Sequence, residues 1–325
     1  DLQGRQDGRK RTFVFLQMSL LALLAVFTGE ATGADGTPFA LTYVAFLIVI
    51  TWLWYSVRRQ DSAEYSVVTG PYLAAMIATI LSITVSAALP DDARVVVWAL
   101  IVVGWILGGI LLTRFRIEGT NLSGTPTDSI VERFGLFTII VLGEVVVGVV
   151  EGISDAERSP IAIVTGMLGL MIGFAYWWTY FDFVGERQPR ASGSSMTNWW
   201  FGHLPATMSI AVTGAAMVSL VEHATDDRAP EGTAWMLAGA VALGLVSLIA
   251  IVHTLAAFDR LPEVYRPVSW AMAAAAGAAL LLGWLRPAPW LLALSLVAVL
   301  TGVWWYAIVR WLRVGDPNEH VPGTG

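Results

Sequence analysis

The sequence predicts an all-α membrane protein, built as a polytopic bundle of about ten transmembrane helices. The chain has 325 residues, of which 56% are hydrophobic and only 14% are charged, whereas soluble domains carry about a quarter charged residues. Apolar segments of about 20 residues recur along the whole chain, and this length crosses a ~30 Å hydrocarbon layer as a helix. The basic residues also alternate regularly between successive connections.

The spans follow from apolar length, and the first is the shortest. The first five lie at 12–27, 39–57, 71–89, 95–113 and 129–150. The second five lie at 161–183, 199–221, 233–257, 268–285 and 290–311. All connections are short, so we expect a single integral-membrane domain over residues 1–325. It comprises a cytoplasmic N-terminal segment (1–11), a transmembrane bundle (12–313) and a cytoplasmic tail (314–325).

The basic residues predict the orientation of these spans. One side of the membrane carries fourteen of the 19 basic residues: Arg5, Arg9, Lys10, Arg11, Arg58, Arg59, Arg114, Arg116, Arg187, Arg190, Arg260, Arg266, Arg310 and Arg313. The other side carries four, namely Arg94, Arg158, Arg228 and Arg286, and it is rich in acidic residues. By the positive-inside rule, both termini are cytoplasmic.

Several classes of function lack support in the sequence. The chain has no cysteine, which excludes disulfides and thiolate metal sites. No histidine or carboxylate spacing predicts a metal site, and no phosphate loop, hydrolase elbow or kinase signature predicts an enzyme or a cofactor. No basic tail or nucleic-acid motif is present. The expected partners are therefore the lipid bilayer and a small solute.

The fifth span, 129–150, is the most informative segment because it carries charges within an apolar helix. At 100° per residue, Arg133, Glu144 and Glu151 fall on one face along ~27 Å, whereas Glu132 points elsewhere. A charge at the bilayer centre costs roughly 2.5–3.5 kcal/mol, so we expect this stripe to face an interior polar path. Glu132 and Arg133 lie near the helix start, where the helix dipole and snorkelling also explain them. Glu144 lies about four turns in, which makes it the central candidate and a candidate proton carrier.

Glycines on the same span predict close helix packing. Gly135, Gly143 and Gly148 thin the helix and would let neighbouring helices approach it. Glycine-rich faces also allow a homo-oligomer, although no clear dimerisation motif is present.

The sixth and seventh spans contribute the remaining candidates for the polar path. Asp182 lies in the aromatic run GFAYWWTYFDF, whose rings otherwise match an interfacial aromatic belt. His203 lies near the inner end of the seventh span, and Glu222 and His223 lie at its outer end. Histidine serves proton relays, yet a single histidine at a helix end is more often an ordinary hydrogen-bonding residue.

The run VERFGLFTIIVLGEVVVGVV resembles the bacterial low temperature requirement A (LtrA) family of polytopic membrane proteins. The family block E-R-[FY]-G-L-F-T-[IL]-I-[VI]-L-G-E matches here from Glu132 to Glu144, and the GFAYWWTYFDF, GHLP and SLVEHA elements look like family counterparts. The resemblance implies a multi-pass protein of the bacterial inner membrane and supplies no reaction. Family members usually open with an E-L-F-F-D-L-V-F-V-F-type span, which is not present here. We therefore expect an N-terminally truncated chain that lacks the family's first helices.

Two functions from different classes stay open at this point. The first is a transporter or permeation protein for a small polar or ionic solute, with proton coupling at Glu144 and an anion-holding or charge-setting role for Arg133. The second is a non-transporting membrane component that supports growth or envelope function in the cold, whose buried charges fix helix packing. A transport site should line a cavity with an unpaired titratable group, whereas structural pairs should be satisfied and dry.

Overall fold

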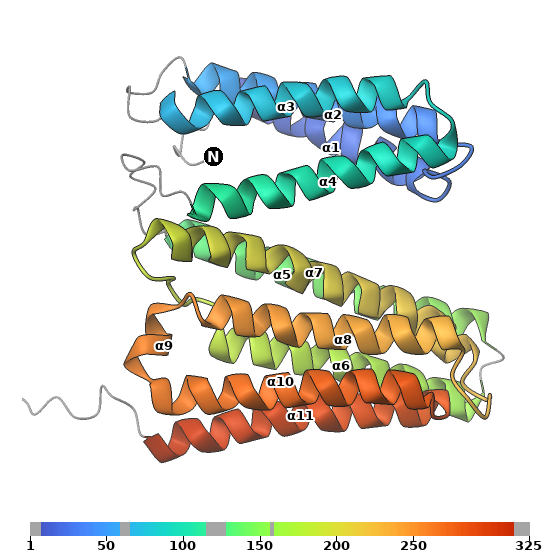
Figure 1. Cartoon of the computed structure of the whole chain (residues 1–325). Helices are drawn as coiled ribbons and strands as arrows, with labels where there is room; N and C mark the ends of the chain where they lie inside the picture. The colour runs from blue at the N-terminus through green and yellow to red at the C-terminus, as the bar shows by residue number, and fades with distance from the viewer. Residues whose placement is uncertain (1–7, 59–65, 115–127, 157–158, 315–325) are drawn as a thin grey trace, which may run out of the picture. The chain divides into compact units, whose positions relative to one another are not determined.

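The computed structural model describes residues 8–58, 66–114, 128–156 and 159–314 (Figure 1). Within these ranges the chain forms eleven α-helices and no strand, which confirms the predicted all-α class. The first four helices are α1 (Gly8–Thr28), α2 (Gly36–Arg58), α3 (Ser66–Ser86) and α4 (Asp91–Arg114). The remaining helices are α5 (Asp128–Asp155), α6 (Pro160–Phe183), α7 (Gly193–Glu222), α8 (Glu231–Val252), α9 (Ala256–Arg260), α10 (Pro262–Leu285) and α11 (Pro289–Val314).

Seven of the described helices are long and apolar enough to cross a membrane, namely α2, α5, α6, α7, α8, α10 and α11. The described apolar parts of α1 and α3 are shorter, at Thr12–Thr28 and Gly70–Ser86. The helix α4 carries Asp91, Asp92 and Arg94 in its first turn. Each predicted span thus corresponds to a helix, but crossing by α1, α3 and α4 stays a prediction.

The helices fall into two compact units, Asp1–Asn121 and Leu122–Gly325. The single integral-membrane domain over residues 1–325 stays a prediction. Unit 1 holds α1 to α4, in which α2 packs against α1 and α3, and α3 packs against α4. Its core is small and is formed by Ala40, Leu47, Met76 and Ile83. Indole hydrogen bonds join α4 to α3, because Trp98 Nε1 donates to Ser86 Oγ at 2.9 Å and Trp105 Nε1 donates to Thr79 Oγ1 at 3.0 Å.

Arg94 in unit 1 is a buried structural arginine. Its Nε donates to the Ser86 carbonyl oxygen, and its Nη2 donates to the carbonyl oxygen of Leu89 and to Thr37 Oγ1. Its Nη1 lies 3.0 Å from an Asp91 carboxylate oxygen. Arg94 therefore closes the connection between α3 and α4 and ties it to the start of α2.

Unit 2 holds six long helices that contact one another in a ring, in the order α5, α7, α8, α10, α11 and α6. In addition, α6 and α7 contact each other across the ring. The core of unit 2 is aliphatic and includes Met217, Leu220, Leu245, Leu292 and Leu296.

The starts of α6 and α7 are determined by local capping residues. Ser159 and Ser192 cap them by accepting hydrogen bonds from backbone amides three residues on, and Pro160 occupies the first turn of α6.

The two ends of unit 2 differ in charge. One end holds the connection from α6 to α7, the helix α9 and the end of α11 (Figure 1). Arg187, Arg190, Arg260, Arg266, Arg310 and Arg313 lie there, and we call it the basic end. Among the described residues of the opposite end, the arginines are Arg228 and Arg286. This separation agrees with the predicted alternation of basic connections.

Candidate functional site

The buried histidine His203 connects three helices of unit 2. Its side chain is 1% exposed. The Nδ1 atom lies 2.7 Å from the Trp199 carbonyl oxygen, and the Nε2 atom lies 3.0 Å from the Tyr180 hydroxyl. Because a carbonyl oxygen can only accept, Nδ1 carries the proton of a neutral ring, and Nε2 accepts from the hydroxyl of Tyr180. The pair therefore joins α7 to α6 through a satisfied hydrogen bond.

Aromatic rings enclose this histidine. The ring centroid of His203 lies 4.5 Å from that of Trp199 and 4.7 Å from that of Phe134 on α5. Trp199 and Phe134 also meet edge to face, with centroids 4.8 Å apart. The surroundings of His203 are thus apolar and tightly packed, and they suit a structural link better than an open relay.

Asp182 lies on α6 and points to a different neighbour. Its carboxylate Oδ2 accepts a hydrogen bond of 2.7 Å from Trp304 Nε1 on α11. The Trp304 ring in turn stacks on Trp178, with centroids 5.1 Å apart. Asp182 therefore joins α6 to α11 within an aromatic cluster, while Tyr180, two residues earlier, joins α6 to α7. The structure does not bring Asp182 and His203 into one site.

Arg187 was not among the predicted site residues, and it lies four residues after α6 ends at Phe183. Glu186 has a positive φ of 61°, an uncommon conformation for a residue with a side chain, and the chain turns there. The Arg187 guanidinium lies 5.3 Å from the Trp311 ring centroid and 5.8 Å from that of Tyr265, and it donates to the Asp182 carbonyl oxygen. The Tyr265 hydroxyl interacts electrostatically with the Arg187 side chain, yet this hydroxyl and Arg187 Nε are both buried without a hydrogen bond of ordinary geometry.

Arg187 is a cation held between two aromatic faces. Within the described part of the chain, no carboxylate forms an ion pair with it. An arginine that follows an aromatic run was the only signal in the sequence, and interfacial anchoring explained that run equally well.

The charged stripe of the fifth span lies on the exposed face of α5. Arg133, Glu144 and Glu151 are all exposed, as is Glu132. The buried face of α5 consists of small and β-branched residues, namely Val131, Gly135, Thr138, Val145, Gly148, Val149 and Gly152. Helical spacing therefore predicted the common face correctly. Within unit 2, α5 packs on its neighbours through the opposite, small-residue face, so an interior polar path along the charged stripe stays a prediction.

Glycines lock α5 against α7 at the level of Glu144. A Cβ atom at Gly148 would lie 2.0 Å from the Gly214 carbonyl oxygen, and one at Gly214 would lie 2.5 Å from the Glu144 carbonyl oxygen. The predicted close approach is thus confirmed at Gly148. At Gly143 a Cβ atom would meet nothing within 4 Å, so the prediction was wrong there. At Gly135 an added Cβ would make only ordinary contact with a phenylalanine ring.

Glu222 and His223 end α7 at the opposite end of the bundle. Glu222 is exposed, and His223 is the C-terminal cap residue, with its Nδ1 atom 2.9 Å from the Ser219 carbonyl oxygen. Both lie far along α7 from His203, about 19 to 20 residues and therefore roughly 30 Å at 1.5 Å per residue. Over the described ranges no three histidine or carboxylate side chains gather in a way that could hold a metal ion. The seven predicted residues thus do not converge on one site.

Comparison with known families decides the membership of the chain. Residues 2–306 match the family described as Bacterial low temperature requirement A protein (LtrA). The chain belongs to the LtrA family. No curated protein and no solved structure matches it. The family match therefore shows a bacterial polytopic membrane protein, and the chemistry of this LtrA chain has to be inferred from its own residues.

The family block of this LtrA chain occupies the first part of α5, over residues 132–144. It includes Glu132, Arg133 and Glu144, which are three of the six exposed charged residues of this helix. The block also supplies Phe134, which packs on His203, and the Glu144 backbone that contacts Gly214. The resemblance and the geometry therefore point to the same helix.

Proposed function

We propose that the protein transports a small polar or ionic solute across the bacterial cytoplasmic membrane, along the charged face of α5. Glu144 is the central titratable group and couples transport to proton movement. Arg133, at the start of the same face, holds an anionic group or sets the charge of a neighbouring acid. The observation that carries this proposal is the exposed stripe of Arg133, Glu144 and Glu151 on an otherwise apolar helix.

The energetic cost of this stripe supports the proposal. A charged side chain facing lipid near the bilayer centre costs roughly 2.5–3.5 kcal/mol, so such residues face protein or water. Glu144 lies on the exposed face of α5, and among the described residues it forms no hydrogen bond or ion pair. A hydrated path along α5 satisfies this carboxylate. The glycine contact between α5 and α7 holds the wall of that path in place.

The charges of the connections supply the orientation. The basic end of unit 2 faces the cytoplasm by the positive-inside rule, and the end that carries Glu222 and His223 faces outward. Glu151 then lies towards the outer mouth of the path and Arg133 towards the inner mouth. We propose cytoplasmic termini for the same reason.

A second function has an observation of its own. His203 and Asp182 are each hydrogen-bonded to an aromatic side chain of a neighbouring helix, and His203 is sealed from water. Satisfied, dry polar contacts are typical of structural links. They favour a non-transporting membrane component that supports growth or envelope function in the cold, with polar residues that fix helix packing.

Flux measurements distinguish the two functions. The protein is reconstituted into proteoliposomes under a pH gradient, and proton flux is recorded with a panel of ions and small metabolites. We expect Glu144→Gln to abolish flux while the protein stays folded and inserted. Asp155→Asn is the matched control, because Asp155 is an exposed acid at the far end of the same helix, and this change should preserve flux.

Two outcomes would contradict the transport proposal. One is flux that Glu144→Gln leaves unchanged, which would remove Glu144 from the path. The other is the absence of solute-dependent flux across the whole panel in the wild-type protein, which favours the structural function.

A further inference from the structure

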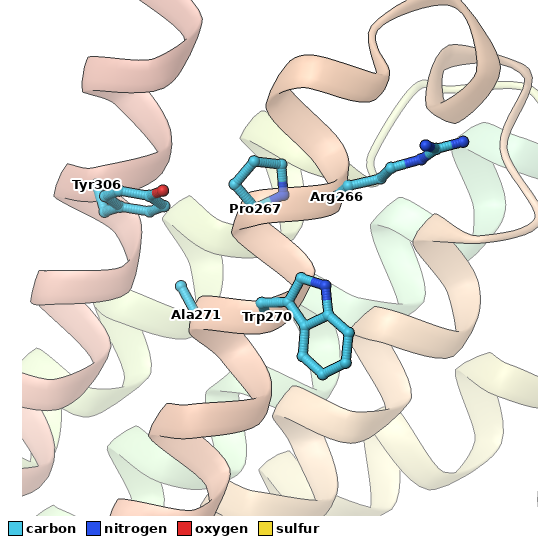
Figure 2. A pocket seen from close by; sticks show the side chains of 5 residues that line it. All are labelled: Arg266, Pro267, Trp270, Ala271 and Tyr306. Carbon is cyan, nitrogen blue, oxygen red and sulfur yellow. The ribbon is translucent and has the colours of Figure 1, made fainter.

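An open groove lies between α10 and α11 on the outside of unit 2. It has a volume of about 550 Å³ and is lined by Arg266, Pro267, Trp270, Ala271 and Tyr306. Figure 2 shows Tyr306 of α11 facing Pro267 of α10, with Ala271 one turn further along α10 and Trp270 beside it. Trp270 is 77% exposed and Tyr306 is 40% exposed. The groove therefore presents an apolar floor with aromatic walls to the surroundings of the bundle.

The groove lies next to the basic end of unit 2. Arg310 follows Tyr306 by four residues, so it lies on the same face of α11, one turn closer to that end. Its Nη2 atom donates to the carbonyl oxygen of Glu263, which precedes Pro267 by one turn of α10. Arg310 thus crosses from α11 to α10 directly above the groove.

Arg310 also carries an unused donor. Its Nε atom is buried and has no hydrogen-bond partner. A buried N–H group without an acceptor is rare, because its desolvation is not compensated. Because the protein covers this atom, an acceptor oxygen from outside the chain would reach it only after the Arg310 side chain turns.

The charges around the groove favour an anion. Arg266 is exposed at its rim, and its side chain extends away from Tyr306 in Figure 2. Within the described ranges neither Arg266 nor Arg310 forms an ion pair with a carboxylate. The nearby acids Asp259 and Glu263 do not pair with these two arginines, because Asp259 pairs with Arg190 and Glu263 contributes its backbone oxygen to Arg310.

We propose that this groove binds an anionic phospholipid. One acyl chain lies over Pro267 and Ala271, between Trp270 and Tyr306, and the phosphate accepts hydrogen bonds from Arg310 and from Arg266 after its side chain turns. Aromatic residues flank the headgroup level of membrane proteins, and basic pockets between transmembrane helices bind anionic headgroups. With the basic end in the cytoplasm, the site lies in the leaflet that carries the anionic lipids.

Native mass spectrometry of the purified full chain in detergent tests the site, with phosphatidylglycerol and phosphatidylcholine of identical acyl chains as probes. We expect tighter binding of phosphatidylglycerol, and an affinity about fivefold weaker for each arginine removed in Arg266→Gln and Arg310→Gln. Trp270→Ala should weaken the binding of phosphatidylglycerol as well. Matched controls are Arg228→Gln and Trp284→Ala, an exposed arginine and an exposed tryptophan towards the other end of the bundle.

Equal affinity for the two lipids in the wild-type protein would overturn the proposal. So would variants of the groove that retain phosphatidylglycerol as tightly as the two controls. If Arg310→Gln does not fold, Arg266→Gln and Trp270→Ala decide, because both side chains are exposed and neither is needed for core packing.

Discussion

The packing of α5 against α7 depends on Gly148, and Gly148→Ala should strongly destabilise unit 2. The added Cβ atom would lie 2.0 Å from the Gly214 carbonyl oxygen and 2.8 Å from the Gly214 carbonyl carbon, whereas ordinary contact begins at 3.4 Å. The two backbones would have to separate by up to the difference between 2.0 and 3.4 Å, about 1.4 Å, because neither is the end of a flexible side chain. Overpacking typically costs about 1–3 kcal/mol, and a backbone clash belongs at the upper end.

Thermal unfolding in detergent at a fixed scan rate measures this effect. A loss of about 3 kcal/mol corresponds to a decrease in apparent Tm of roughly 6–12 °C for a folding unit of the size of unit 2, Leu122–Gly325. Gly143→Ala is the matched control, since Gly143 lies on the same helix and an added Cβ would meet nothing within 4 Å. Alanine is the better helix former by about 0.5–1 kcal/mol, so the control should unfold no earlier than the wild type. An unchanged Tm for Gly148→Ala, or an equal loss in both variants, would refute the close packing of these helices.

Other contacts give predictions that the same unfolding assay checks. Tyr180→Phe leaves His203 Nε2 buried without a donor and should lower the free energy of unfolding by about 1–3 kcal/mol. The double variant with His203→Phe should lose less stability than the sum of the two single changes. Additive losses would argue against the hydrogen bond. Trp304→Phe removes the donor to Asp182 and should lower the Tm, while Asp182→Asn in the Trp304→Phe background should have little further effect. Arg94→Lys keeps the charge in unit 1 but cannot reproduce the planar set of hydrogen bonds, so a clear loss of stability is expected, and a neutral result would contradict the structural role.

The helices of this protein were predictable because a bilayer imposes length and hydrophobicity on each span separately. Long apolar runs therefore predicted α5, α6 and α8 without knowledge of their neighbours. The common face of Arg133 and Glu144 was also predictable, since it depends only on the helical repeat. The predicted helix ends were less accurate than the helices themselves. For example, α7 begins at Gly193, six residues before the predicted start at 199. Ser192 caps this start, and a cap is not visible in the hydrophobicity of the sequence.

Features that depend on contacts between distant segments were not predictable. Spacing places Glu144 and Gly148 on α5, but it does not say which side of the helix meets α7. Here the small residues around Gly148 determined the packing face, and the charges took the side left over. The aromatic cage of Arg187 depends on a turn at Glu186 and on rings from α10 and α11, and none of these is adjacent in the sequence.

The exposed face of α5 limits what the protein can be in a membrane. The buried residues of α5, which lie between Val131 and Gly152, pack within unit 2 on the face opposite Glu144. The side chain of Glu144 therefore cannot turn inward without breaking the contact between α5 and Gly214 of α7. A carboxylate at this depth is stable only when water, another protein surface or a proton compensates it. Water along the face makes α5 the wall of a transport path, whereas a dry protein surface makes it an interface. The two cases differ in the effect of Glu144→Gln: removing the charge abolishes flux in the first, and in the second it removes a contact of the interface and changes stability or assembly.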